Sequence, residues 1–87
     1  MLDSDVEVEK LETAIIELIL KNEDEAHLIM AKVWVGILIE NDNIDAIKNL
    51  NYFLPIQAFT YGLFKFPKIL NEMKDMIRNR LIKNQFE

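Results

Sequence analysis

The chain has 87 residues, of which 51% are hydrophobic, and its formal net charge is −5. A domain of this length buries only about 60% of the surface that its unfolded chain exposes. We therefore predict one domain over residues 1–87 and expect another protein or a second copy to cover part of its apolar surface. The absence of cysteine excludes disulfide bonds, thiolate chemistry and metal binding by cysteine.

The amino-terminal segment MLDSDVEVEK is acidic, which is unlike a secretory signal or a mitochondrial transit peptide. The apolar run over residues 28–39 is shorter than the ~20 residues that cross a bilayer, and it contains Lys32. We expect a cytoplasmic protein without a membrane span, acting in the host cytoplasm if it is phage-encoded.

The first helix is predicted from Ser4 to about Lys21. Ser4 and Glu7 have the spacing of a capping box, in which each side chain accepts from the other residue's backbone amide. Apolar residues then recur three and four positions apart along the segment, as they do on the buried face of a helix.

Residues 27–40 read HLIMAKVWVGILIE, which fits a buried strand, a membrane segment or a helix without a polar side. The run is too short for a membrane span, and a lone strand has nothing to pair with. We predict a helix over about 23–40, capped by Asn22 and nearly all apolar. Because no single neighbour could cover it, we place it at the centre of the fold, with Trp34 as its largest anchor.

Two prolines divide the second half of the chain. A proline lacks the amide donor that a helix interior needs but suits a first helical position. Pro55 therefore predicts an end to a helix over 43–53 and the start of another over 55–66, and Pro67 predicts the start of a last helix. Whether 55–66 and 67–85 form one kinked helix or two stays open. The predicted fold class is all-α, a compact bundle of four to five helices.

The sequence gives no indication of catalysis. It contains one histidine and lacks a glycine-rich loop, so we expect neither an enzyme nor a cofactor. Asp24 and His27 have the spacing of a helical metal site, but further inward-facing ligands are missing. The segment from Asn41 also fails as a calcium loop, because Ala46 stands where glycine is required. We predict no metal site.

Charge is distributed unevenly, since residues 1–45 hold 12 acidic and 3 basic residues. A compact acidic surface is attracted to basic clefts of proteins that handle nucleic acid. We predict a small regulatory or inhibitory protein that occludes such a cleft. In size and charge it is similar to nuclease-immunity proteins and small phage-encoded inhibitors, without a motif of either. The candidate partner-binding acids are Asp5, Glu9, Glu12, Glu23, Asp24 and Glu25.

Two other surfaces are kept as candidates. The last helix is rich in basic residues, which would suit a DNA-binding regulator, although the acidic remainder of the chain repels a polyanion. The candidate nucleic-acid contacts are Lys74, Arg78, Arg80 and Lys83. An apolar interface, for a homodimer or for an obligate subunit of an assembly, is the other candidate. Its residues are Tyr61, Phe64 and Phe53.

Overall fold

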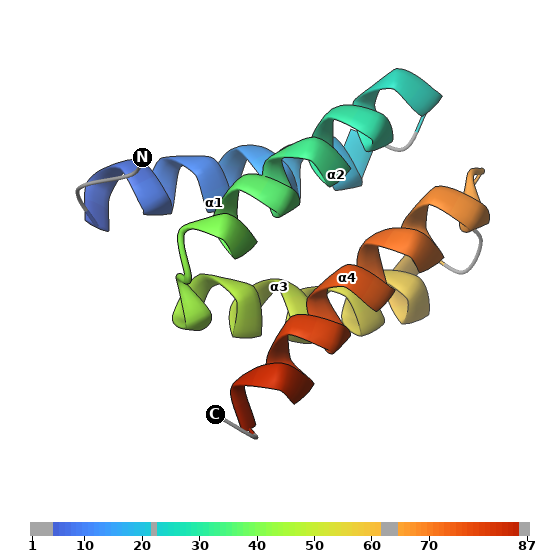
Figure 1. Ribbon diagram of the computed structural model, residues 1–87. Helices are drawn as coiled ribbons and strands as arrows, with labels where there is room; N and C mark the ends of the chain where they lie inside the picture. Colours follow the sequence, from blue (N-terminus) through green and yellow to red (C-terminus); the bar gives the residue numbers. More distant parts are fainter. Residues whose placement is uncertain (1–4, 22, 62–64, 86–87) are drawn as a thin grey trace.

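The computed structural model describes the backbone of residues 5–21, 23–61 and 65–85, and the side chains of 6–21, 23–54 and 65–85. This part of the chain contains helices and no strand (Figure 1). The helices are α1 (Asp5–Lys21), α2 (Glu25–Glu40), α3 (Ile44–Tyr61) and α4 (Pro67–Gln85). The prediction of an all-α bundle is confirmed, with four helices.

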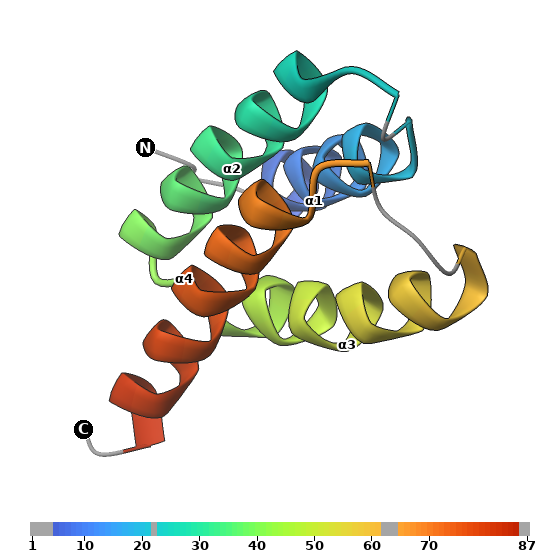
Figure 2. The ribbon, with the colours of Figure 1, turned by 90° about the vertical axis from the view of Figure 1, so that its right-hand side faces the viewer.

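The helices are arranged around the pair α2 and α3, which contact each other. Both α2 and α3 also pack against α1 and α4, whereas the backbones of α1 and α4 do not come close to each other in the described part of the chain. Figures 1 and 2 show α1 and α4 on different sides of this central pair. Each outer helix therefore packs against both members of the pair, and the outward face of α2 lies between α1 and α4.

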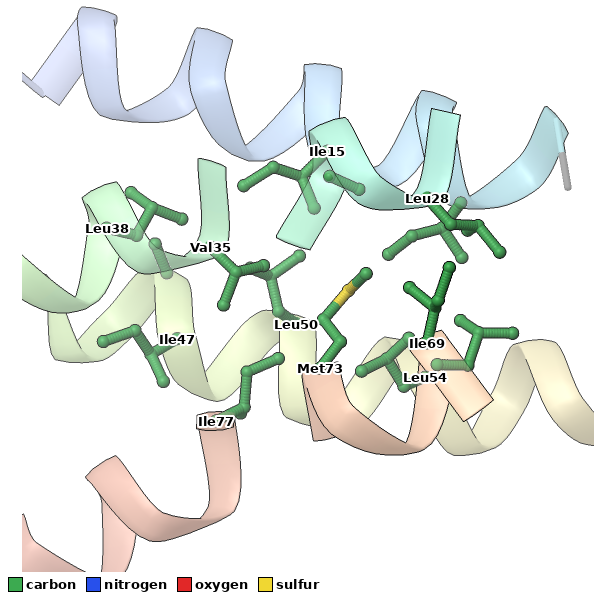
Figure 3. Packing of buried hydrophobic residues seen from close by; sticks show 14 residues of the cluster. Ile15, Leu28, Val35, Leu38, Ile47, Leu50, Leu54, Ile69, Met73 and Ile77 are labelled. Atoms are coloured by element: carbon green, nitrogen blue, oxygen red, sulfur yellow. The ribbon is translucent and has the colours of Figure 1, made fainter. Parts of the chain in front are cut away.

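The core is one cluster of apolar side chains that all four helices supply, and Figure 3 shows them pointing towards a shared centre. The buried residues are Ile15 and Ile19 of α1, Leu28, Ala31, Val35 and Leu38 of α2, Ala46, Ile47, Leu50 and Leu54 of α3, and Ile69, Leu70, Met73 and Ile77 of α4. Most follow one another at three- and four-residue intervals, so each helix buries one face. Fully burying a large aliphatic side chain contributes roughly 1.5–3 kcal/mol.

The turns between helices use polar caps. Asp24 caps α2, because its carboxylate accepts a hydrogen bond from the Ala26 amide at 2.9 Å. This corrects the prediction that Asn22, which lies outside the described residues, is the cap. Asn43 performs the same role for α3 by accepting from the Ala46 amide at 3.2 Å. Asp42, between the two helices, has a φ of 55°, in the left-handed region that a tight turn needs.

Pro55 does not end a helix, and the predicted separate helix over 55–66 is wrong. Helix α3 continues through Pro55 to Tyr61, and α4 begins separately at Pro67, at the first position that favours proline. An interior proline removes one backbone hydrogen bond, to the carbonyl four residues earlier. That carbonyl belongs to Asn51, which is exposed, so water can replace the bond. Leu50 and Leu54, both buried, hold this part of α3 against the core.

Helix α2 contacts each of the other three helices but is not enclosed by them. Leu28, Ala31, Val35 and Leu38 are buried on one face, while Ile29, Met30, Val33 and Ile37 are exposed on the other. The expectation that so apolar a helix is covered on every side therefore does not hold within the described chain. None of the described helices combines the length and the apolar character needed to cross a membrane.

Candidate interaction surfaces

The structure brings acidic residues from two helices together in a shallow groove between α1 and α3. Glu9 and Glu12 of α1 and Asp45 of α3 line it, and its volume is about 300 Å³. The remaining lining residues are Val8, Asn43, Ala46 and Asn49. We call this surface the acidic groove. Its carboxylate and amide oxygens can accept hydrogen bonds from cationic side chains.

Local sequence explains why these acids meet. Glu9 and Glu12 are three residues apart in α1 and so lie on neighbouring positions of one helix face. Asp45 lies in the first turn of α3, where the positive end of the helix dipole favours a carboxylate. None of the three forms an ion pair with another described residue. The groove therefore keeps its negative charge available to a partner.

The other predicted acids form a second, separate cluster. Glu23 and Asp24 are exposed in the turn between α1 and α2, and Glu25 is exposed at the start of α2, at the opposite end of α1 from Glu9. With 17 residues, α1 is about 25 Å long at 1.5 Å per residue. The predicted single acidic face is therefore two surfaces. The Asp5 side chain lies outside the described residues.

Asp24 and His27, which have the spacing of a helical metal site, are both among the side chains that the structure describes. Among them, no group of three or more histidine, aspartate or glutamate residues is arranged to hold an ion. Asp24 uses its carboxylate to cap α2. His27 is half-buried, and its Nδ1 atom has no hydrogen-bond partner among the described residues.

The basic residues of α4 do not share one face. Lys74 and Arg78 line a groove of about 370 Å³ against α3, together with Asn51 and Leu54. Lys83 instead lines a groove between α4 and α2. Arg80 donates a hydrogen bond to the carboxylate of Asp42 and forms an ion pair with it. The predicted nucleic-acid contacts therefore point in different directions from the helix.

Two ion pairs that the sequence did not reveal connect α4 to the α2 region. Lys32 of α2 donates to Glu72 of α4 at 2.8 Å, and this hydrogen bond lowers the pKa of Glu72. The hydrogen bond from Arg80 likewise lowers the pKa of Asp42. Their partners are about 40 residues apart in the sequence, so no local pattern could have identified them.

Of the three candidates for an apolar interface, the structure describes the side chain of Phe53 alone. Phe53 is half-buried and packs against the core, so it is not a free interface residue. The side chain of Tyr61 and all of Phe64 lie outside the described residues. The structure shows a different apolar surface on α2, formed by Ile29, Met30, Val33 and Ile37. Their spacing of one, three and four residues places them on one face of a helix, and it is the signal in the sequence that could have identified this surface.

No family model, curated protein sequence or solved structure matches this chain. The inference of a function therefore depends on the charges, contacts and exposed side chains of the chain itself.

Proposed function

We propose that the chain is a small acidic regulatory or inhibitory protein that works in the cytoplasm without catalysis. It binds a larger protein through the acidic groove, which accepts lysine or arginine side chains from a basic, nucleic-acid-handling site and blocks that site. One observation supports this most directly. Carboxylates from two helices line one groove and are not neutralised by ion pairs within the described chain.

The charge of the whole molecule supports the same proposal. Net charge of −5 and the concentration of acids in residues 1–45 create a negative field around α1. Such a field accelerates association with a positively charged cleft and repels the nucleic acid that the cleft would otherwise bind. Charge at the rim of an interface affects the association rate and its salt dependence most strongly.

The test is quantitative capture of partners from a lysate of the source organism by the wild type and by a variant with Glu9→Gln, Glu12→Gln and Asp45→Asn. These amides keep the shape of the groove and remove its charge. The association rate of each captured partner is then measured with the purified proteins. A rate that falls at least about tenfold with the variant supports the proposal. The control replaces two exposed acids that lie outside both the acidic groove and the apolar surface on α2, Glu17→Gln and Asp75→Asn, and should bind the same partner within about twofold.

The same comparison of the groove variant with the control variant can contradict the proposal. If groove and control variants bind the captured partner equally, the acidic groove does not recognise it and the proposal fails. DNA binding by α4 is the weaker alternative, because Arg80 is engaged by Asp42 and the other basic side chains lie on two sides of the helix.

A further inference from the structure

Four exposed apolar side chains form a continuous stripe along the outer face of α2. Ile29, Val33 and Ile37 are spaced four residues apart, and Met30 lies beside them, so all four occupy one helix face. Between 37% and 56% of each residue is exposed. We call these four residues the α2 stripe. It is about 12 Å long from Ile29 to Ile37, at 1.5 Å per residue.

The surroundings of the α2 stripe show that no described helix covers it. The opposite face of α2 supplies the core residues, and α4 packs along one side, where Lys32 pairs with Glu72 and Gly36 approaches the end of Met76. Helix α1 also packs against α2, and its backbone does not come close to that of α4 in the described part of the chain. The stripe therefore lies between two helices and faces outward.

Carboxylates mark both ends of the α2 stripe. Glu25 is exposed four residues before Ile29, and Glu40 is exposed three residues after Ile37, so both lie near the stripe on the helix surface. Glu23 adds a further exposed carboxylate at the first end. Lys32 is the one lysine or arginine of α2, and Glu72 already pairs with it. The α2 stripe therefore has an apolar centre and acidic ends.

We infer that the α2 stripe docks an amphipathic helix of another protein, with aliphatic side chains on one face and lysine or arginine beside them. Aliphatic side chains would pack against Ile29, Met30, Val33 and Ile37, as in helix recognition by an apolar surface. The cationic residues would pair with Glu25 and Glu40. This inference rests on the proposed function as a protein-binding domain, and it names a second surface and the kind of segment that binds there.

Charge complementarity selects this occupant over a second copy. In a two-fold contact through the stripe, a parallel arrangement brings Glu25 near its symmetry mate, and an antiparallel arrangement brings Glu25 near Glu40 of the other copy. Carboxylates meet carboxylates in both cases, which disfavours the contact. An anionic membrane surface is repelled for the same reason. A cationic helix avoids this repulsion and gains ion pairs.

The length of the stripe sets the size of the partner segment. A helix that packs side by side with α2 lies about 8–10 Å from its axis and follows it for a few turns. Glu25 and Glu40 are about 22 Å apart along the helix axis, so five turns, or about 18 residues, are enough to extend past both. Trp34 is half-buried in the same helix and is the one tryptophan of the chain, so its fluorescence can report the contact.

The probe is a synthetic helix of about 18 residues with leucine on one face and lysine on the other, compared with a peptide that carries glutamate in place of lysine. The lysine peptide should shift the Trp34 emission and the NMR signals of the stripe methyl groups in a saturable manner. It should bind at least about tenfold more tightly than the glutamate peptide. Equal binding of the two peptides would overturn the inference.

Variants of the protein separate the stripe from general charge attraction. Val33→Asp should weaken binding of the lysine peptide at least about tenfold, whereas Ile82→Asp, at an exposed apolar residue of α4, should change it less than about twofold. Replacing the carboxylates at the stripe ends, Glu25→Lys with Glu40→Lys, should weaken binding more than Glu9→Lys with Glu12→Lys. Both double variants change the net charge equally, so only location differs.

The outcomes also separate this inference from the proposed function. If Glu9→Lys with Glu12→Lys weakens peptide binding and Val33→Asp does not, the peptide binds the acidic groove and the inference about the stripe is wrong. If the protein alone is dimeric and Val33→Asp makes it monomeric, a second copy occupies the stripe and the inference is equally wrong. If Val33→Asp loses peptide binding but still captures the partner that the acidic groove binds, the inference about the stripe is supported. The proposed function is then tested separately by the variants of the acidic groove.

Discussion

Arg80, near the end of α4, forms an ion pair with Asp42 in the turn between α2 and α3. The arginine side chain is 11% exposed, so most of it is packed inside the protein before it reaches the carboxylate. Asp42 also holds the turn in its left-handed conformation, with a φ of 55°. The contact therefore ties the last helix to the turn that joins α2 and α3, and it withdraws Arg80 from the basic surface.

Replacement of Asp42 by asparagine tests this contact. The amide is isosteric and asparagine tolerates the left-handed region, so the variant removes charge without straining the turn. We expect a lower free energy of unfolding in chemical denaturation, because Arg80 loses its charged partner while mostly buried. Asp75→Asn, at an exposed position of α4, is the control and should leave stability unchanged. Equal stability of both variants would mean that the ion pair contributes nothing.

Stability should fall as the pH is lowered through the acidic range. The hydrogen bonds from Arg80 and Lys32 hold the pKa values of Asp42 and Glu72 below their ordinary values. The unfolded chain then binds more protons than the folded chain at acidic pH, so stability decreases as the pH falls from the ordinary carboxylate range through the lowered pKa values. Thermal unfolding measured at successive pH values should show a shallower decline for Asp42→Asn with Glu72→Gln. Parallel curves would contradict the assignment.

Pro55 should lower the stability of α3, because it cannot donate the backbone hydrogen bond of an interior helical position. Pro55→Ala restores that donor and should raise the free energy of unfolding by about 1–3 kcal/mol. Pro67→Ala is the matched control, since Pro67 occupies the first position of α4, where proline is favourable. It should not raise stability. A destabilised Pro55→Ala variant would show that α3 requires the proline.

DNA binding offers a direct comparison with the alternative function. Because Arg80 is paired and Lys74 and Lys83 lie on different sides of α4, we expect no salt-dependent binding to duplex DNA, even at low salt. Fluorescence anisotropy with labelled duplex at increasing salt measures this. Binding that weakens steeply with salt and is lost in Lys74→Gln with Arg78→Gln would instead support the DNA-binding regulator.

Local sequence patterns predicted most of the helices. Apolar spacing and Pro67 identified the first and last helices, because these features act within a few residues of one another. Pro55 was misleading, since packing of Leu50 and Leu54 against the core outweighs one lost hydrogen bond. The cap of α2 is Asp24 and not the predicted Asn22, because several polar residues in that turn are suitable caps and local sequence does not distinguish them.

Tertiary contacts determine which residues lie together on each surface, and local sequence patterns do not predict those contacts. The acidic groove needs Asp45 beside Glu9 and Glu12, which depends on how α3 packs against α1. The apolar run of α2 indicated a helix, but it did not reveal that Val33 faces outward while Val35 is buried. Only the positions of the neighbouring helices distinguish the two valines.

The division of α2 into a buried face and an exposed binding face is the central claim. The most direct measurement is the free energy of unfolding of Val33→Asp and Val35→Asp, two identical substitutions two residues apart. We expect Val33→Asp to remain folded, within about 0.5 kcal/mol of the wild type, because its site is exposed. Val35→Asp should be unfolded, because it buries an unpaired charge. An unfolded Val33→Asp, or a folded Val35→Asp, would contradict the claim.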